Sequence, residues 1–379
     1  MTEKLYYKDS YISEFSATIL FSKPAGEFFD IVLDKTAFFP EEGGQSSDTG
    51  FIADAKVVYV YEEDGVIYHR TEKLPADNVV SCRIDFDDRF DKMQQHTAEH
   101  ILSGVIHSLY GYDNVGFHLG ADVVTFDINH PMTREELDRV EELANKAVFD
   151  NIEIETIFPT PEELGNMVYR SKLDLTENVR IVKIGDVDSC ACCAPHVNYT
   201  GEVGLIKCLD FMSHRGGVRI TMCAGKRALL DYREKYRNIR EISAMLCEPQ
   251  HTTANGLEKY MSDKEKLKLD LRTVRKAYAE ALADSVQSSG NYVAVLEHVE
   301  MDELRDFANK AVLSVSGILV ALIGRDGDYK YIMASSNADL RAMAKDINAK
   351  LNGRGGGQPQ MIQGSLFATL EEIKAYFNC

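Results

Sequence analysis

The amino-acid sequence predicts an α+β protein that consists of a small N-terminal β-barrel, a two-layer α+β domain, a helical coiled-coil-like segment and a small C-terminal α/β domain. Three observations predict this class. Short runs of alternating apolar residues fill roughly the first ninety positions, helix and strand patterns then follow without a βαβ repeat, and a later stretch has apolar residues at 3-4 spacing. We place the four parts at residues 1–90, 91–230, 231–285 and 286–379.

The composition excludes several classes of protein. Of the 379 residues, 45% are hydrophobic and 27% are charged, which is typical of a globular protein and not of a disordered chain. No apolar run approaches the roughly 18 residues that span a membrane, and the N-terminus has no signal-peptide core, so we expect a cytoplasmic protein with reduced cysteines. The net charge of −18 argues against a simple nucleic-acid binder, so contact with RNA would need local basic patches.

The first part is expected to be rich in strands. Apolar residues alternate in four runs, at residues 17–21, 28–33, 56–61 and 65–69. Short strands at this spacing indicate a small barrel or sandwich. Residues 40–45, with the sequence Pro-Glu-Glu-Gly-Gly-Gln, interrupt the pattern and are expected to form a loop.

The second part begins with a helix expected over residues 89–109, where apolar residues recur at helical spacing and Gly111 follows as a stop signal. A second helix is expected over residues 133–149, because Thr133 and Glu136 form a capping-box pattern. Strand patterns accompany these helices near residues 115–128, 152–157, 179–184, 203–211 and 217–223.

The third part is predicted to hold long helices over about residues 225–285, with a break at Pro249. The second of these helices carries a coiled-coil-like stripe with one polar member. The stripe consists of Leu257, Tyr260, Lys264, Leu267, Leu271, Val274, Tyr278 and Ala281. We expect a homodimer through residues 256–284, and the alternative is a solvated helical hairpin.

The C-terminal part is predicted to contain strands at residues 318–323 and 329–334, then a helix over residues 338–351 that is capped by Asn337. This order describes a separate small α/β domain. A glycine-rich loop and a terminal helix are expected to follow, at residues 353–357 and 369–378.

Two histidines four positions apart are the strongest local chemical signal. His96 and His100 lie on one face of the predicted helix, so both imidazoles can reach one metal ion. Metalloproteases of the His-Glu-x-x-His type have glutamate directly after the first histidine, and here that residue is Thr97. The pair therefore indicates a metal site and argues against that peptidase class.

A second set of metal donors lies about ninety residues further on, in the segment Cys-Ala-Cys-Cys-Ala-Pro-His at residues 190–196. Thiolate and imidazole are both good zinc donors, and three residues separate Cys192 from His196. Together with the two helical histidines they would complete a four-coordinate zinc shell. Cys190 and Cys193 remain alternative thiolate donors, and a cysteine-rich turn without metal is the other interpretation.

Taken together, these motifs resemble the zinc signature of the alanyl-tRNA synthetase editing domain and of its free-standing relatives, the AlaX-type alanyl-tRNA editing proteins. The likeness covers nearly the whole chain, and the similar segments occur in the order of that family. They are the glycine-rich loop at residues 39–50, the stretches at 196–204 and 215–220 around and after the zinc donors, and residues 355–364, which resemble the glycine-rich end of the DHH-associated C-Ala domain.

The resemblance implies an editing enzyme that works in trans, without an aminoacylation half, on mischarged tRNA(Ala). It would hydrolyse the ester of Ser-tRNA(Ala), with Gly-tRNA(Ala) as a second candidate substrate, and would hold Zn²⁺ through His96, His100, Cys192 and His196. The sequence does not decide between serine and glycine, nor whether zinc activates water or positions the substrate. We find no nucleotide-binding motif of a synthetase.

Further residues are expected to line the substrate pocket. Gln45 and His118 are candidates, and Gly43 and Gly44 would let the tRNA terminus approach closely. The family usually has threonine directly before the last zinc histidine, where this chain has Pro195. Because proline lacks the hydroxyl and the backbone N–H, any substrate contact made by that threonine is in doubt.

For the C-terminal part the resemblance implies tRNA binding. Arg341, Lys345 and Lys350 are expected to share roughly one helical face, and Arg354 continues into the glycine loop. A glycine backbone can approach phosphates or a flat base closely, and the glycines concerned are Gly355, Gly356 and Gly357. The alternative is a solvated helix face beside a flexible turn.

Two other functions compete with editing. A non-catalytic tRNA-binding protein with a structural zinc would use the same four donors. A zinc hydrolase of a small ester or amide would need neither the long helices nor the C-terminal domain. Deacylation of Ser-tRNA(Ala) by the purified protein separates editing from both.

Overall fold

The computed structural model describes residues 2–171 and 179–379. The chain forms two compact units, Met1–Asn238 and Ile239–Cys379. The finer division into four parts stays a prediction. Within the described ranges, no helix has the length and apolar character needed to cross a lipid bilayer.

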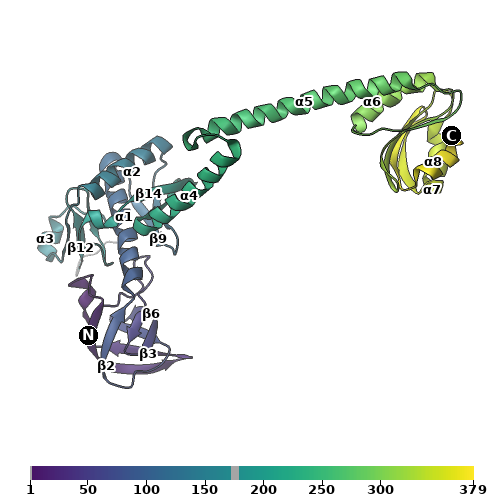
Figure 1. The fold of residues 1–379 in the computed structure, drawn as a ribbon. Helices are drawn as coiled ribbons and strands as arrows, with labels where there is room; N and C mark the ends of the chain where they lie inside the picture. Colours follow the sequence, from purple (N-terminus) through teal and green to yellow (C-terminus); the bar gives the residue numbers. More distant parts are fainter. Residues whose placement is uncertain (1, 172–178) are drawn as a thin grey trace. The chain divides into compact units, whose positions relative to one another are not determined.

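Six antiparallel strands of the first unit close into a barrel, in the order β2-β3-β7-β6-β5-β8 (Figure 1). The small barrel expected from the sequence is therefore present, and its interior is filled by alternate apolar side chains. Two short strands, β1 Glu3–Lys4 and β4 Lys35–Thr36, pair beside it. The barrel strands are β2 Glu14–Ala25, β3 Phe28–Leu33, β5 Gly50–Ile52, β6 Ala55–Glu63, β7 Val66–Thr71 and β8 Val79–Ile84.

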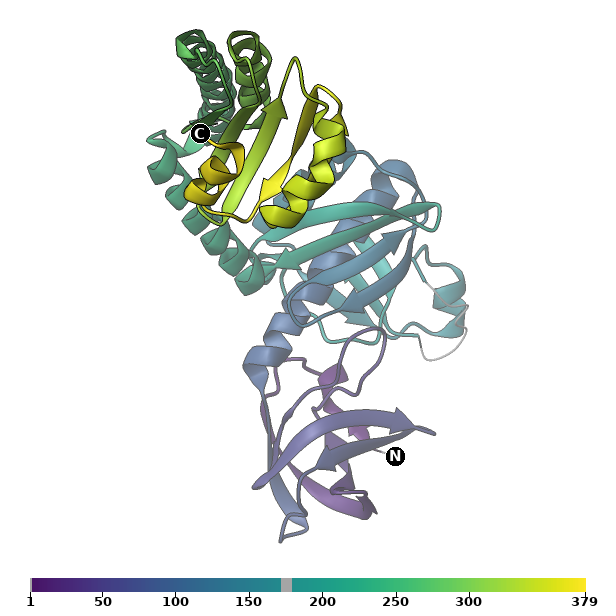
Figure 2. The ribbon, with the colours of Figure 1, turned by 90° about the vertical axis from the view of Figure 1, so that its right-hand side faces the viewer.

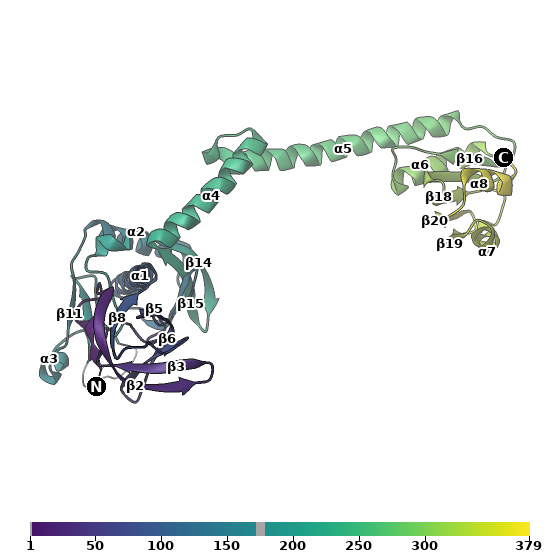
Figure 3. The ribbon, with the colours of Figure 1, turned by 60° about the horizontal axis from the view of Figure 1, so that its bottom comes forward.

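The rest of the first unit is built around the helix α1 Phe86–Tyr110, which Figure 3 shows nearly end-on. One apolar core joins α1 to the helix α2 Arg134–Phe149 and to two sheets, which have the strand orders β14-β15-β10-β9 and β11-β12-β13. A short helix, α3 Pro161–Gly165, follows β11. The strands are β9 Asn114–Leu119, β10 Val124–Ile128, β11 Ile154–Ile157, β12 Ile181–Ile184, β13 Asp188–Ala191, β14 Ile206–His214 and β15 Gly217–Ala224.

Two expected helix ends are confirmed, the stop of α1 at Gly111 and the start of α2 at Thr133. Gly111 ends α1 with a φ of 69°, a left-handed conformation that glycine adopts without strain. Thr133 caps α2, and its hydroxyl accepts from the N–H of Glu136 while the Glu136 carboxylate accepts from the N–H of Thr133.

A buried ion pair fixes the barrel to the start of α1. Arg89, which is fully buried, donates to both carboxylate oxygens of Asp48 in the loop between β4 and β5. The same guanidinium donates to the backbone carbonyls of Ser10 and Ala37. Because this loop also carries the Gly-Gly-Gln segment, Arg89 sets the position of that segment relative to α1.

The second unit has a five-stranded sheet in the order β16-β17-β18-β20-β19, with helices on both faces. Figure 2 shows α7 and α8 over one face. The helix α6 and the end of α5 pack on the other, and α4 contains the boundary between the units. The elements are α4 Gly225–Leu246, α5 Thr253–Ser285, β16 Tyr292–Val295, α6 Met301–Ala311, β17 Leu319–Arg325, β18 Asp328–Ala334, α7 Leu340–Lys350, β19 Gly353–Gln358, β20 Met361–Leu366 and α8 Leu370–Phe377.

Three expectations for this unit are wrong. The glycine-rich segment is not a loop but the edge strand β19, where Gly355 pairs with Gly364. A Cβ on Gly355 would lie 2.3 Å from the Tyr331 hydroxyl, so glycine is required for close packing and not for flexibility. The cap of α7 is Asp339, whose carboxylate accepts from the N–H of Ala342, and not the expected Asn337.

The third error concerns the expected basic face of α7. Lys350 lies nine positions after Arg341, which at about 3.6 residues per turn puts it on the opposite side of the helix. Lys350 pairs instead with Asp346 at 3.2 Å. Arg341 and Lys345 remain together on one exposed face, and Arg354 lies over the ring of Phe367.

Candidate metal centre

Four donor side chains from two segments meet beside the barrel. His96 and His100 lie one turn apart on α1, and Cys192 and His196 come from the segment that follows β13. Their ligand atoms all lie within 4.8 Å of one another. The Cys192 sulfur is 3.6 Å from Nε2 of His96 and 3.4 Å from Nε2 of His196.

Each of the three imidazoles is held from behind by a hydrogen bond at Nδ1. Nδ1 of His96 donates to Oε1 of Gln45 at 2.9 Å, and Nδ1 of His100 donates to Asp188 at 3.0 Å. Nδ1 of His196 and the Thr97 hydroxyl share a hydrogen bond of 3.0 Å. Because Gln45 Oε1 and the Asp188 carboxylate are acceptors, Nδ1 of His96 and of His100 carries a proton, and Nε2 of each ring is the atom available to a metal. This arrangement is the usual support of metal-binding histidines.

The donor set fits zinc. Zinc takes sulfur at about 2.3 Å and nitrogen at about 2.0–2.1 Å in a tetrahedral shell, which requires sulfur–nitrogen separations of about 3.6 Å. The two sulfur–nitrogen separations at Cys192, 3.6 and 3.4 Å, agree with that value. All three histidines are at most 4% exposed, so the imidazoles are shielded from water.

The electrostatics also favour a cation. Burial alone would raise the pKa of the Cys192 thiol, but the surrounding imidazoles hold it well below its usual value. Burial lowers the pKa of His196 to about 3, which keeps that imidazole neutral. Burial would lower the pKa of His100 too, yet the thiols of Cys190 and Cys192 raise it well above its usual value. The cluster therefore favours a thiolate beside one positive charge, which a bound metal would supply.

The structure distinguishes the three cysteines of the cluster. Cys193 lies against the barrel core, and a Cβ on Gly43 would be 3.5 Å from its sulfur. Burial raises the pKa of the Cys193 thiol. Cys190 shares a second, overlapping group of donors with His100 and Asp188, whereas Cys192 belongs to the four-donor cluster. Cys192 is thus the best placed of the three to join both helical histidines.

A cavity of about 470 Å³ opens onto the metal centre. Its wall includes His96, His100 and Cys192, so a ligand in the cavity would reach the metal position. Glu99, which is 4% exposed, lines it and accepts hydrogen bonds from Ser103 and Asn114. The remaining wall consists of Tyr7, Glu42, Gly43, Asn114, Phe117, Phe158, Arg170, Ser171, Val179, Arg180, Cys190, Ala191 and Cys193.

The structure places only some of the expected pocket residues at the cavity. Gly43 lines the cavity, and Gly44 packs so closely that a Cβ would lie 2.7 Å from the Phe117 carbonyl. Gln45 is fully buried and supports His96 instead of lining the pocket. His118 is exposed, because side chains alternate along β9, and its neighbour Phe117 faces the site with its ring 4.6 Å from that of His96. The expectation for His118 is therefore wrong by one position.

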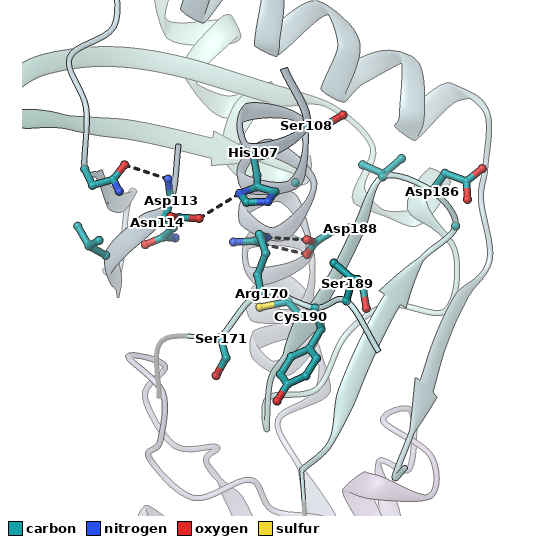
Figure 4. A pocket seen from close by; sticks show the side chains of 17 residues that line it. His107, Ser108, Asp113, Asn114, Arg170, Ser171, Asp186, Asp188, Ser189 and Cys190 are labelled. Atoms are coloured by element: carbon teal, nitrogen blue, oxygen red, sulfur yellow. Dashed lines mark hydrogen bonds and ion pairs between the residues drawn. The ribbon is translucent and has the colours of Figure 1, made fainter. Parts of the chain in front are cut away.

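A second cavity of about 820 Å³ adjoins the first and shares with it Asn114, Arg170, Ser171 and Cys190. Figure 4 shows Arg170 and Asp188 at its centre, joined by two hydrogen bonds of 2.7 and 2.9 Å. Because Asp188 also accepts from His100, the guanidinium, carboxylate and imidazole form one chain that leads to the metal centre.

Sequence analysis missed several of these residues. Asp188 could have been found, because Asp188, Cys190 and Cys192 recur with the period of two expected for one face of an extended segment. Arg170 and Arg180 carry no such signal, since only the fold brings them to the cavity. Pro195 is buried and is not among the described residues that line the cavity. The C-terminal candidates, from Arg341 to Gly357, belong to the other unit.

Known proteins are similar to this chain in the segments that form the metal centre and beyond them. Residues 179–221 match the family described as the threonyl and alanyl tRNA synthetase second additional domain. The alanyl-tRNA editing protein AlaX-L of Pyrococcus horikoshii is 31% identical, and the alignment covers 98% of this chain and 96% of that protein. The alanine–tRNA ligase of Thermococcus kodakarensis is also 31% identical, over 99% of this chain but only 43% of the ligase.

Among solved structures, the C-Ala domain of alanyl-tRNA synthetase from Aquifex aeolicus matches with 20% identity and a TM-score of 0.21. That match covers 24% of this chain and 92% of the other chain.

Proposed function

Because the chain belongs to the family of the alanyl-tRNA editing proteins, we propose that it removes wrongly attached amino acids from tRNA(Ala) by hydrolysing the aminoacyl ester. The observation that carries the proposal is the buried four-donor cluster at the wall of a cavity, in a chain that matches an editing protein over nearly the full length of both. The proposed metal is Zn²⁺, held by His96, His100, Cys192 and His196.

The reaction consumes one water molecule. The water oxygen bonds to the ester carbonyl carbon, the bond between that carbon and the ribose oxygen breaks, and one proton passes to the ribose oxygen, which leaves free amino acid and uncharged tRNA. A zinc ion in this donor set can lower the pKa of a bound water or hold the substrate amino group. The protein itself supplies a cavity beside the donors and fixes each histidine by a hydrogen bond at Nδ1.

We propose Ser-tRNA(Ala) as the main substrate and Gly-tRNA(Ala) as a second one. The cavity wall has polar groups, among them Glu99 and Asn114, that a serine hydroxyl could pair with. A site that hydrogen-bonds a hydroxyl discriminates strongly against a side chain that lacks it, because the polar groups of the site are then left unpaired. Ala-tRNA(Ala), and Gly-tRNA(Ala) as well, should therefore be deacylated more slowly than Ser-tRNA(Ala).

A tRNA-binding protein with a purely structural zinc is the competing proposal, since four protein donors can close a tetrahedral shell. The cavity at the donors favours catalysis, because a structural site needs no access. A zinc hydrolase of small esters is disfavoured by the match over both units. We therefore propose tRNA(Ala) as the partner. We also propose that the protein is cytoplasmic and acts as a homodimer.

The test is deacylation of Ser-tRNA(Ala), Gly-tRNA(Ala) and Ala-tRNA(Ala) by the purified full-length protein, with zinc measured on the same sample. We expect release of serine to be fastest and alanine slowest, with one zinc per chain. If zinc-loaded protein releases none of the three amino acids, the editing proposal is wrong and the tRNA-binding alternative is favoured. If all three amino acids are released at the same rate, the protein is an aminoacyl-tRNA hydrolase but does not edit.

A further inference from the structure

Arg180 is a buried cation in the wall of the metal cavity that the proposed mechanism does not use. It is 7% exposed and lies one residue before β12. Its Nη1 donates to the carbonyls of Cys192 at 2.9 Å and Ala194 at 2.8 Å. Its Nε is buried and has no hydrogen-bond partner. The guanidinium therefore keeps hydrogen-bonding capacity that the protein leaves unused.

The surroundings of Arg180 also leave its charge without a carboxylate. In the described ranges, no acidic group forms an ion pair with Arg180, and its other neighbour is the face of the Tyr7 ring, 5.5 Å away. A buried charge without an ion-pair partner is costly, and a bound anion would offset that cost.

Arg170, on the same cavity wall, provides the contrast. Its guanidinium is paired in bidentate fashion with Asp188, and although burial would lower its pKa, Asp188 raises the pKa above the usual value. The two arginines thus differ in one respect. Arg170 is paired with a carboxylate of the protein, whereas no described carboxylate pairs with Arg180.

We propose that Arg180 forms a phosphate-binding subsite that takes the phosphodiester preceding the terminal nucleotide of the bound tRNA. This inference rests on the proposed function, since it assumes that the aminoacyl ester lies at the metal centre. The phosphate in question is separated from the ester by a single ribose, and the cavity that contains the metal donors also contains Arg180. Guanidinium matches phosphate in charge and geometry.

The role of the subsite is to position the ester. Binding energy from a part of the substrate that does not react fixes the reacting carbonyl at the metal centre. It also offers a local attraction for a polyanion on a chain of net charge −18. Arg180 is a binding residue for the phosphate, while its bonds to Cys192 and Ala194 keep the donor loop in place.

The experiment compares adenosine and adenosine 5′-monophosphate as inhibitors of Ser-tRNA(Ala) deacylation by full-length, zinc-loaded protein. A hydrogen-bonded ion pair predicts that the monophosphate inhibits at about 10- to 100-fold lower concentration than adenosine. Arg180→Gln should bring the two inhibition constants together and leave that of adenosine nearly unchanged. Arg70→Gln, which removes a charge from a barrel residue that is not among those lining the cavity, should keep the wild-type ratio.

The outcomes decide separately on the two proposals. Equal inhibition by both compounds in the wild type, or an unchanged ratio in Arg180→Gln, would overturn the phosphate subsite while the deacylase remains. If the wild type does not deacylate, the proposed function fails, and calorimetric binding of adenosine and of its 5′-monophosphate still tests the subsite by the same ratio. If Arg180→Gln loses zinc, Arg180→Lys is used in its place. The ratio of the two inhibition constants should then fall by at least about threefold. An unchanged ratio would overturn the subsite.

Discussion

Cys192 is the single residue on which the candidate metal centre depends most, because it is the thiol placed between two of the three imidazoles. Cys192→Ala should lower zinc content from about one per chain to near zero and abolish deacylation, since three neutral imidazoles hold zinc less tightly than three imidazoles and a thiolate. Elemental analysis and the deacylation assay measure both effects.

Cys193→Ala is the matched control for that substitution. Cys193 packs on the barrel core, so we expect full zinc content and only a modest loss of stability. Cys190→Ala should also keep its zinc. Loss of zinc in either control, together with retention in Cys192→Ala, would move the thiolate ligand to another cysteine.

His69 predicts a defined pH dependence of stability. Its imidazole is fully buried in the barrel between the Ile31 carbonyl and the Thr36 hydroxyl, and burial lowers its pKa from 6.5 to about 4. Because the folded state disfavours the charged form, the contribution is complete above pH 6.5 and is lost as the pH falls from 6.5 to 4. The shift corresponds to about 3 kcal/mol in the free energy of unfolding.

Urea unfolding of the wild type and of His69→Gln between pH 7 and pH 4 tests this effect. Over that pH range the free energy of unfolding should fall by about 3 kcal/mol more in the wild type than in the variant. His118→Gln changes an exposed histidine and should follow the wild type. Parallel curves for the wild type and His69→Gln would show that His69 is not the titrating group.

Among the elements, the loop between β4 and β5 links the barrel to the metal centre. Gly44 has a φ of 83°, and a Cβ there would meet the Phe117 carbonyl at 2.7 Å. Gly43 has a similar φ of 62°, but its nearest neighbour would be 3.5 Å away. Both glycines should resist substitution, and Gly44 more strongly because the colliding atom belongs to the backbone.

We therefore expect Gly44→Ala to lower the free energy of unfolding by about 1–3 kcal/mol more than Gly43→Ala. Thermal or urea unfolding of zinc-loaded protein measures the difference. Stability rather than activity is the proper readout, since Gly43 also lines the cavity. Equal losses would mean that the positive φ alone, and not the approach to Phe117, makes glycine necessary.

The helix α5 presents an exposed apolar stripe. Leu267, Leu271 and Val274 are 67%, 50% and 65% exposed, which is unusual for a row of large apolar side chains on one helix. A homodimer through this stripe remains our prediction. Sedimentation equilibrium at micromolar concentration should give twice the chain mass of 42.5 kDa.

Leu267→Glu combined with Val274→Glu should shift the protein to the monomer, because like charges would face each other across the stripe. Lys266→Glu, which lies outside the stripe, is the control for added negative charge and should stay dimeric. A wild-type mass of a single chain would contradict the dimer.

For the molecule as a whole, the two units divide the proposed tasks of catalysis and tRNA binding. The sequence puts the start of the tRNA-binding part near residue 286, but Ala279 and Ala283 of α5 lie in the same apolar core as α6. Deletion from residue 286 would open that core. A chain that ends at Leu246, the last residue of α4, avoids this damage.

The shortened chain should keep its zinc, because all four donors lie in the first unit. It should bind tRNA(Ala) more weakly than the full chain and with a smaller dependence on salt, since fewer phosphate contacts release counterions. Filter binding over a range of salt concentrations measures both quantities. Equal affinities and equal salt slopes would remove the second unit, with Arg341 and Lys345, from the tRNA-binding surface.

Much of the fold and of the site follows from the sequence alone. Local patterns are sufficient where a structure depends on neighbours in the chain, as in the ends of α1 and α2, the break near Pro249 and the pairing of His96 with His100. The spacing of Cys192 and His196 likewise reflects one short segment whose geometry is set locally. These features need no knowledge of distant residues.

Only the tertiary structure decided the features that depend on contacts between distant segments. The strand β19 is an edge strand because Gly355 packs on Tyr331, although glycine locally favours a loop. Phe117 and not His118 faces the cavity, because the register of β9 against β10 sets which side chain points inward. Arg170 and Arg180 reach the cavity through long-range packing. No periodicity in the sequence encodes a distance between segments that only the fold brings together.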